Sequence, residues 1–256
     1  MNLKYNTAFY TIIRREFIRM LRISSQVFLP AVITTALYFL IFGTLIGKRI
    51  GDIDRVSYSL FIAPGLIMMS VITNSYGNVS TSLFSSRFQK NIEELLVSPI
   101  PMPILLFGYI TGGLIRGTIV ALLVFIVANF FVHMHVQHIL LSILVILLVA
   151  GIFSLAGFSN ALYAKTFDEI MLVPTFLLTP LTYLGGIFYS TNMLSPIWQK
   201  LSHLNPIWYM VNALRYAIIG SAETNIYIAL IFMSGIFVSL IAGNLILLNK
   251  GIGLKE

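Results

Sequence analysis

The chain has 256 residues, of which 58% are hydrophobic and 10% are charged, with a formal net charge of +7 and a mean hydropathy of +0.92. A soluble domain carries about 25% charged residues, so this composition excludes an ordinary soluble fold. Several apolar runs reach the roughly 20 residues that a helix needs to cross a bilayer, and no segment alternates like a membrane β-strand. We therefore expect an all-α integral membrane protein.

Residues 1–26 are expected to form an amphipathic helix lying in the membrane interface. Arg15, Arg19 and Arg22 follow one another at i, i+4 and i+7 on one face. A second face carries a helical series of apolar side chains, namely Tyr5, Phe9, Ile12, Ile13, Phe17, Met20 and Leu21. This pattern is typical of an interfacial helix. The basic face suits either a plain membrane anchor or an additional contact with a cytoplasmic partner.

Six segments are expected to span the membrane: residues 27–47, 58–81, 104–132, 138–163, 170–189 and 226–248. An even number of spans places both chain termini on one side. That side carries ten Lys and Arg residues against five on the other. The positive-inside rule then makes both termini cytoplasmic. The basic excess therefore reports topology, and nucleic-acid binding is not expected.

A short cytoplasmic helix is expected over residues 87–97, after the second span. Its apolar side chains recur on one face at helical spacing, as Phe84, Phe88, Ile92, Leu95 and Leu96. Glu93 and Glu94 lie away from that stripe, and the prolines that follow cannot continue a helix. We expect the apolar face to rest on the protein itself. The acidic face is either simply solvated or offered to a partner.

The third span contains a charge, Arg116, near its middle. A charge at that depth is expensive, so we expect it to face protein or a cavity. It either contacts an anionic lipid or sugar headgroup, or acts as an internal hydrogen-bonding partner. Small-xxx-small spacing of the neighbouring glycines predicts tight packing inside the protomer, through Gly108, Gly112, Gly113 and Gly117.

Residues 190–222 are too long for a hairpin turn and too apolar for a free outer loop. Pro196 and Pro206 each suit the start of a helix, so we expect a re-entrant hairpin of two short helices in the outer leaflet. The fifth span, just before it, contains Pro174 and Pro180 and is expected to bend.

Several catalytic and binding motifs are absent from the sequence. It has no P-loop, no H-E-x-x-H and no G-x-S-x-G, so the chain should not bind ATP itself or act as a zinc protease or serine hydrolase. His133, His135 and His138 lack a nearby carboxylate or cysteine and are expected to form a polar interfacial turn. We expect no metal, no cofactor and no catalytic residue on this chain.

The segment "NIEELLVSPIP" resembles the segment between the second and third spans of ABC-2 type transporter permeases. Further stretches are similar to bacterial inner-membrane members of that family: "LYFLIFGTLIG", "PGLIMMSVITNSY", "SLAGFSNALYAKTFDEI", "VPTFLLTPLTYLGGIFYS" and "LSHLNPIWYM". The resemblance runs from about Ile18 to Leu254. It implies a permease subunit that pairs with a second copy of itself and with two copies of a separate ATPase, which holds the ATP and Mg. Export of an amphipathic lipid, lipid-linked glycan or hydrophobic drug is expected.

The resemblance also implies roles for particular residues. The helix over 87–97 would be the coupling helix, held in place by Phe88, Ile92, Leu95 and Leu96. Its ATPase-facing residues would be Gln89, Asn91, Glu93 and Glu94. The translocation path would form between two protomers, with Asn74, Tyr76, Asn78, Tyr183 and Arg116 as candidates. These polar groups could equally be ordinary interhelical hydrogen bonds.

The alternative function is a membrane-embedded enzyme acting on lipid-linked sugars. Such an enzyme needs a carboxylate pair or basic cluster at a membrane face. Asp168 and Glu169 form the adjacent acidic pair that remains after Glu93 and Glu94. They sit beside Lys165 in a short loop, which is more simply explained as a charged turn that caps the fifth span.

Overall fold

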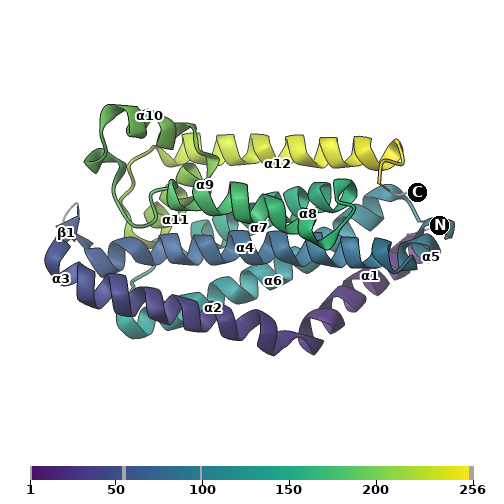
Figure 1. Cartoon of the computed structure of the whole chain (residues 1–256), viewed down its shortest axis with the longest axis horizontal. Helices are drawn as coiled ribbons and strands as arrows, with labels where there is room; N and C mark the ends of the chain where they lie inside the picture. Colours follow the sequence, from purple (N-terminus) through teal and green to yellow (C-terminus); the bar gives the residue numbers. More distant parts are fainter. Residues whose placement is uncertain (1, 54–55, 99, 254–256) are drawn as a thin grey trace.

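The computed structural model describes residues 2–53, 56–98 and 100–253 and consists almost entirely of helices (Figure 1). In chain order the elements are α1 (Asn2–Arg22), α2 (Ser24–Tyr38), the π-helix η1 (Phe39–Ile46), α3 (Gly47–Ile50), β1 (Asp52–Ile53), β2 (Val56–Ser57), α4 (Tyr58–Phe88), α5 (Asn91–Val97), α6 (Met102–Phe131), α7 (Ile139–Tyr163), α8 (Phe167–Leu172), the π-helix η2 (Val173–Leu178), α9 (Thr179–Tyr183), the 3-10 helix η3 (Thr191–Met193), α10 (Pro196–Leu204), α11 (Pro206–Ile219) and α12 (Ile226–Asn249). The two short strands pair antiparallel.

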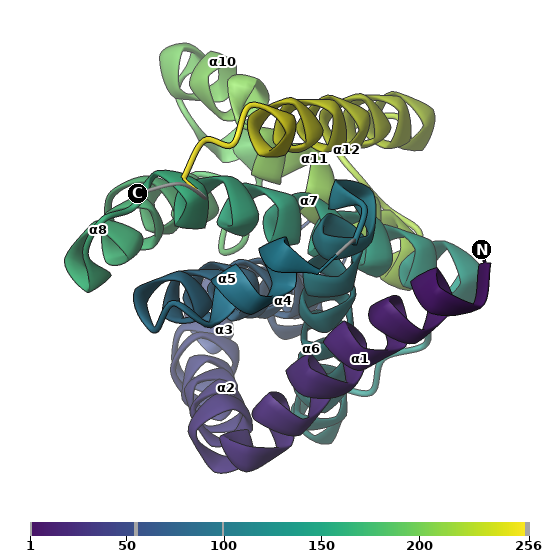
Figure 2. The same ribbon diagram turned by 90° about the vertical axis from the view of Figure 1, so that its right-hand side faces the viewer.

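The long helices run side by side between two ends of the molecule (Figure 1). At one end, called the α5 end, lie α5, the start of α1 and the last turn of α12. At the opposite end, called the α10 end, lie α3, β1 and α10. Seen from the α5 end, α1 crosses in front of α6, and α12 lies on the other side of α4 (Figure 2). The helices therefore share one long axis, as membrane spans do.

Helix α4 lies at the centre of the bundle and packs against α6, α7 and α11. Most of its apolar stretch is buried inside the protein, whereas α12 and the α2–η1 helix are mostly exposed. Lipid tails are as apolar as Leu, so spans associate mainly through close packing. The expected tight packing of the third span is confirmed, because all four of its glycines are buried. A methyl group on Gly108 would come within 2.6 Å of Ile12 in α1.

Five helices in the described part of the chain are long and apolar enough to cross a membrane: Ser24–Ile46, Tyr58–Phe88, Met102–Phe131, Ile139–Tyr163 and Ile226–Asn249. The fifth expected span, residues 170–189, is a helix only as far as Tyr183. It consists of α8, η2 and α9 in succession and stays short of the roughly 20 residues of a regular span. Gly186 follows with a φ of +73°, a backbone conformation that favours glycine.

Pro174 explains why this short helix departs from regular geometry. Proline has no N–H, so it cannot donate to the carbonyl four residues earlier, and the segment becomes π-helical from Val173. The carbonyl of Ile170 accepts a hydrogen bond from the side chain of Asn160 in α7 instead, at 3.1 Å. The neighbouring span thus satisfies the group that the proline leaves unpaired.

Helices α10 and α11 begin at Pro196 and Pro206, as the sequence predicts. Helix α11 packs among α4, α7 and α12, and α10 lies outside it. Arg215, which the charge count treated as an outer-loop residue, is buried in α11. It donates to the carbonyl of Gly186 at 2.7 Å and stacks over the ring of Phe61. The buried Arg215 therefore holds α11 against the segment that follows α9.

We expect replacement of Gly157 by alanine to destabilise the α4–α7 contact. The new methyl carbon would lie 2.5 Å from the backbone oxygen of Tyr76, which a flexible side chain cannot relieve. Overpacking of this kind costs about 1–3 kcal/mol, so the melting temperature in detergent should fall. The matched control is Gly235→Ala in α12, where a methyl group would meet nothing within 4 Å. Equal melting temperatures for both variants would contradict the assignment.

Candidate functional site

The structure divides the expected coupling helix into two pieces. Helix α4 continues to Phe88, and α5 starts at Asn91 after a reversal at Lys90, whose φ is +60°. The prediction of one helix over residues 87–97 is therefore wrong in its first residues. A left-handed residue interrupts the helix there. The turn places α5 as a separate short element at one tip of the bundle (Figure 1).

The two faces of α5 differ as the sequence predicts. Ile92 is only 3% exposed and packs in the same apolar cluster as Phe84, with Leu95 partly buried beside it. Asn91, Glu93 and Glu94 are exposed. The side chain of Leu96 lies outside the described residues. Helix α5 is thus seated by Ile92 and presents two carboxylates outward.

Phe88 does not belong to the buried apolar stripe that the sequence predicts. Its side chain is 65% exposed, so it does not hold α5 in place as expected. It sits instead against two other rings, with centroids 6.0 Å from Phe84 and 5.2 Å from Phe167. Phe88 also lines a cavity of about 480 Å³ beside α5, together with Lys90, Glu93 and Lys165. An exposed aromatic side chain next to charged groups is suited to contact with another molecule.

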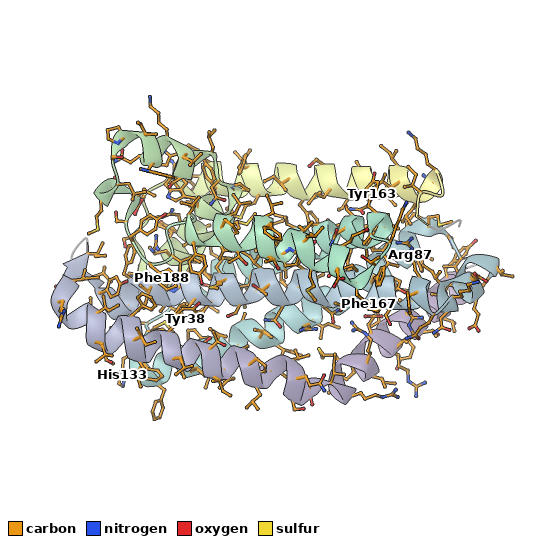
Figure 3. The ribbon with its side chains drawn as sticks, in the orientation of Figure 1. Tyr38, Arg87, His133, Tyr163, Phe167 and Phe188 are labelled. Atoms are coloured by element: carbon orange, nitrogen blue, oxygen red, sulfur yellow. The ribbon has the colours of Figure 1, made fainter. Side chains whose placement is uncertain are left out.

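Arg87 connects the end of α4 to the end of α7. Its Nη1 group donates to the carbonyls of Ala161, Leu162 and Ala164, the last two at 3.1 and 3.2 Å. These carbonyls lie at the C-terminus of α7, where helical partners run out. Figure 3 shows Arg87 toward the α5 end, on the same side as Phe167 and Tyr163. A displacement of α5 would therefore reach two long helices at once.

A row of polar side chains runs along α4 with a spacing of four residues. Its members are Asn74, Asn78, Ser82 and Ser86, called the polar row below. Each bonds a charged residue from a neighbouring helix: Asn74 bonds Arg116, Asn78 bonds Arg19, Ser82 bonds Glu16 and Ser86 bonds Arg15. Residues four apart share one helix face, so the row joins α4 to α1 and α6.

Glu16 is the acidic centre of this arrangement and was missed in the sequence. Its carboxylate is 1% exposed, accepts from Ser82 Oγ at 2.6 Å, and pairs with Arg19 at 3.0 Å. Arg15 lies 3.7 Å from it. The regular spacing of the polar row was visible in the sequence, but the helix that faces it was not.

The arginines of α1 divide into inner and outer groups. Arg15 donates to Tyr109 at 2.5 Å and Arg19 to Asn78 Oδ1 at 2.8 Å, so both point into the protein. Arg22 remains exposed. The basic face of α1 thus contacts α4 and α6 through Arg15 and Arg19, two of its three members.

Arg116 faces a cavity of about 280 Å³ between α2, α4 and α6. Its Nε and Nη2 groups both donate to Asn74 Oδ1, at 3.3 and 3.1 Å. Tyr38 lines the same cavity and lies 3.2 Å from the hydroxyl of Tyr183. Two of the five path candidates, Asn74 and Arg116, therefore line this cavity, and a third, Tyr183, contacts its lining residue Tyr38.

The other two path candidates lie elsewhere. Tyr76 is 1% exposed inside the main apolar core, and Asn78 is occupied by Arg19. Neither is among the residues that line the Arg116 cavity. Both are interhelical packing residues, which is the alternative that the sequence left open.

Glu169, one of the acidic pair beside Lys165, caps a helix. Thr166 Oγ1 accepts from the backbone N–H of Glu169 at 3.2 Å, and the Glu169 carboxylate accepts from the N–H of Lys165 at 2.7 Å. This reciprocal arrangement resembles a capping box at the start of α8. Asp168 lies in the first turn of the same helix, where a negative charge is favourable.

Removing the Glu16 carboxylate should destabilise the chain. In a Glu16→Ala variant, Ser82 loses the acceptor of its 2.6 Å hydrogen bond and Arg19 loses its ion-pair partner. Breaking a buried ion pair costs about 3 kcal/mol. Thermal unfolding in detergent measures the loss. Asp168→Ala, which removes an exposed carboxylate, is the control and should melt like the unchanged chain. If the two variants melt together, Glu16 does not hold α1 to α4.

Residues 7–219 match the family described as ABC-2 type transporter. The chain is 54% identical over 216 residues to the inner membrane transport permease YadH of Escherichia coli strain K12, which covers 84% of each chain. It is 22% identical over 208 residues to nodulation protein J of Neorhizobium galegae, covering 81% of this chain and 79% of that protein. The resemblance seen in the sequence is confirmed, and the chain belongs to the ABC-2 type transporter family.

Proposed function

We propose that the chain is the membrane-spanning subunit of an exporter driven by a separate ATPase. Two copies of the chain would pair with two ATPase subunits, which hold the ATP and Mg. The α5 end would face the cytoplasm and the chain would lie in a bacterial inner membrane. Two findings support this proposal: the chain belongs to a transporter family, and its 54% identical relative is an inner membrane transport permease.

The observation that carries the proposal is that α5 has one buried face and one exposed, acidic face. Ile92 is buried and holds the helix against the protein, while Glu93 and the exposed Phe88 border a cavity of about 480 Å³. Glu94 is exposed on the same short helix. An aromatic anchor surrounded by charges is the usual composition of a binding hot spot. This surface would receive a complementary basic or apolar segment of the ATPase.

Coupling would be mechanical. When the ATPase pair closes on ATP, α5 would move, and its link through Arg87 would carry the motion to α4 and α7 together. Rigid displacement of packed helices is a common form of such transitions. The π-helical segments η1 and η2 interrupt the regular geometry of their helices, so these helices are suited to bend as the path opens.

The substrate path would run along α2 and α9. Tyr38 and Tyr183 lie hydroxyl to hydroxyl there, and the ring of Phe188 packs 5.6 Å from that of Tyr38 (Figure 3). Aromatic rings with polar edges can contact both an acyl chain and a sugar. This composition favours an amphipathic substrate, such as a lipid, a lipid-linked glycan or a hydrophobic drug.

The first experiment is co-expression with candidate ATPase subunits encoded beside this chain, followed by purification through a tag on the permease alone. A stable complex with vanadate-sensitive ATP hydrolysis in lipid is the expected result. Failure of every such ATPase to co-purify would overturn the proposal.

A Glu93→Lys, Glu94→Lys double variant should uncouple hydrolysis from transport. Both carboxylates are exposed, so the change should leave folding intact and weaken co-purification of the ATPase at least tenfold. Asp52→Lys, an exposed charge reversal at the α10 end, is the matched control. Melting temperature in detergent checks that both variants fold. Normal coupled hydrolysis in the double variant would show that α5 does not contact the ATPase.

A further inference from the structure

The cavity at Arg116 lies at the middle of the membrane-spanning bundle. Arg116 stands halfway along α6, and Asn74 stands halfway along α4. One part of the lining is polar and consists of Gln26, Thr34, Thr35, Ser70, Thr73, Asn74 and Arg116. Another part is apolar and consists of Val27, Pro30, Ala31, Leu66 and Met69. A cavity with both kinds of surface fits a molecule that has both kinds of group.

The charge of Arg116 has no carboxylate partner in the described part of the chain. Both ion pairs found there involve Glu16, and neither includes Arg116. The next member of the polar row, Asn78, binds a second cation, Arg19, whose charge Glu16 balances at 3.0 Å. No described carboxylate balances Arg116 in this way, and the medium around it screens charge poorly.

The contact with Asn74 positions the guanidinium without neutralising it. Asn74 donates to the carbonyl of Ser70 at 3.0 Å, which turns its oxygen toward Arg116. Nε and Nη2 of Arg116 both use that one oxygen. Its Nη1 group makes no hydrogen bond with any described residue. A planar guanidinium held along one edge can present its other edge to an oxyanion.

We propose that this cavity binds the anionic group, a phosphate or a carboxylate, of the transported amphiphile. Arg116 supplies the charge contact, and the hydroxyls of Thr35 and Ser70 border the same space. Headgroups of resident lipids lie at the membrane surface, whereas Arg116 is midway along its span. The occupant is therefore a molecule in passage. The inference rests on the proposed transport function and narrows its substrate to anionic amphiphiles.

The test uses the full chain in nanodiscs of phosphatidylcholine, with its ATPase where one co-purifies. The probe is dodecyl phosphate carrying a photoactivatable diazirine near the phosphate, and labelled peptides are mapped by mass spectrometry. Label is expected on the α2 and α4 segments that line the cavity. Unlabelled dodecyl phosphate should displace the probe at a concentration at least tenfold lower than dodecyltrimethylammonium or dodecyl glucoside. Equal displacement by the three amphiphiles would overturn the proposal.

Variants at position 116 give a second readout. Arg116→Gln should lower labelling of these segments at least tenfold, and Arg116→Lys should stay within threefold of the unchanged chain. The control, Arg49→Gln, removes an exposed arginine from α3 and should have no effect. Unchanged labelling in Arg116→Gln would contradict the proposed anion site at Arg116. If that variant is not recovered folded, the competition on the unchanged chain decides.

Labelling requires neither ATP nor transport. Absence of any ATPase partner would therefore overturn the proposed function while the labelling result still stands on its own. Conversely, a coupled transporter whose cavity prefers no anion would keep the proposed function and lose the anionic site.

Discussion

The buried carboxylate of Glu16 is the contact on which the arrangement of α1, α4 and α6 depends. It lies on a helix rich in arginine and accepts from both Arg19 and Ser82, so one negative charge orders two helices. In lipid the apolar surfaces of helices gain little by meeting each other. Directional polar contacts then decide which faces meet. The polar row on α4 supplies those contacts at every turn from Asn74 to Ser86.

This dependence gives α4 two tasks along one axis. Toward the α5 end it joins α7 through Arg87, and its last turns lie beside the apolar cluster that contains Ile92. At its middle it holds Arg116 through Asn74. A movement that begins at α5 would thus be transmitted along a single well-packed helix to the cavity. The helices α12 and α2–η1 are mostly exposed, so in the proposed transporter they would contact lipid or a second copy.

Helix positions followed from the sequence because apolar length and proline placement act locally. Pro196 and Pro206 start α10 and α11, and the glycines of α6 pack as their spacing requires. The error over residues 87–97 lies where a turn interrupts the helical pattern. Phe88 has helical spacing with Ile92, but the left-handed Lys90 separates them.

The site was predictable only where one segment carries it. The two faces of α5 are a local pattern, whereas Glu16 and Arg215 find their partners on helices distant in sequence. The sequence shows each donor and acceptor, but it does not show which helix packs against which. The charge count illustrates this limit, since Arg215 belongs to the core and not to an outer loop.

Arg116 separates the substrate classes that an amphipathic path would otherwise accept together. A fixed cation halfway through a membrane is costly unless something negative visits it. Neutral drugs would gain nothing from the charge, whereas lipids and lipid-linked glycans that carry a phosphate would exchange hydration for the guanidinium. Tyr38 lines the cavity, and Tyr183 lies next to it. Neither side chain carries a charge, so both can contact acyl or sugar groups of the same molecule. Charge at one point and aromatic surface next to it would therefore select for a substrate with an anionic head and an extended, uncharged remainder.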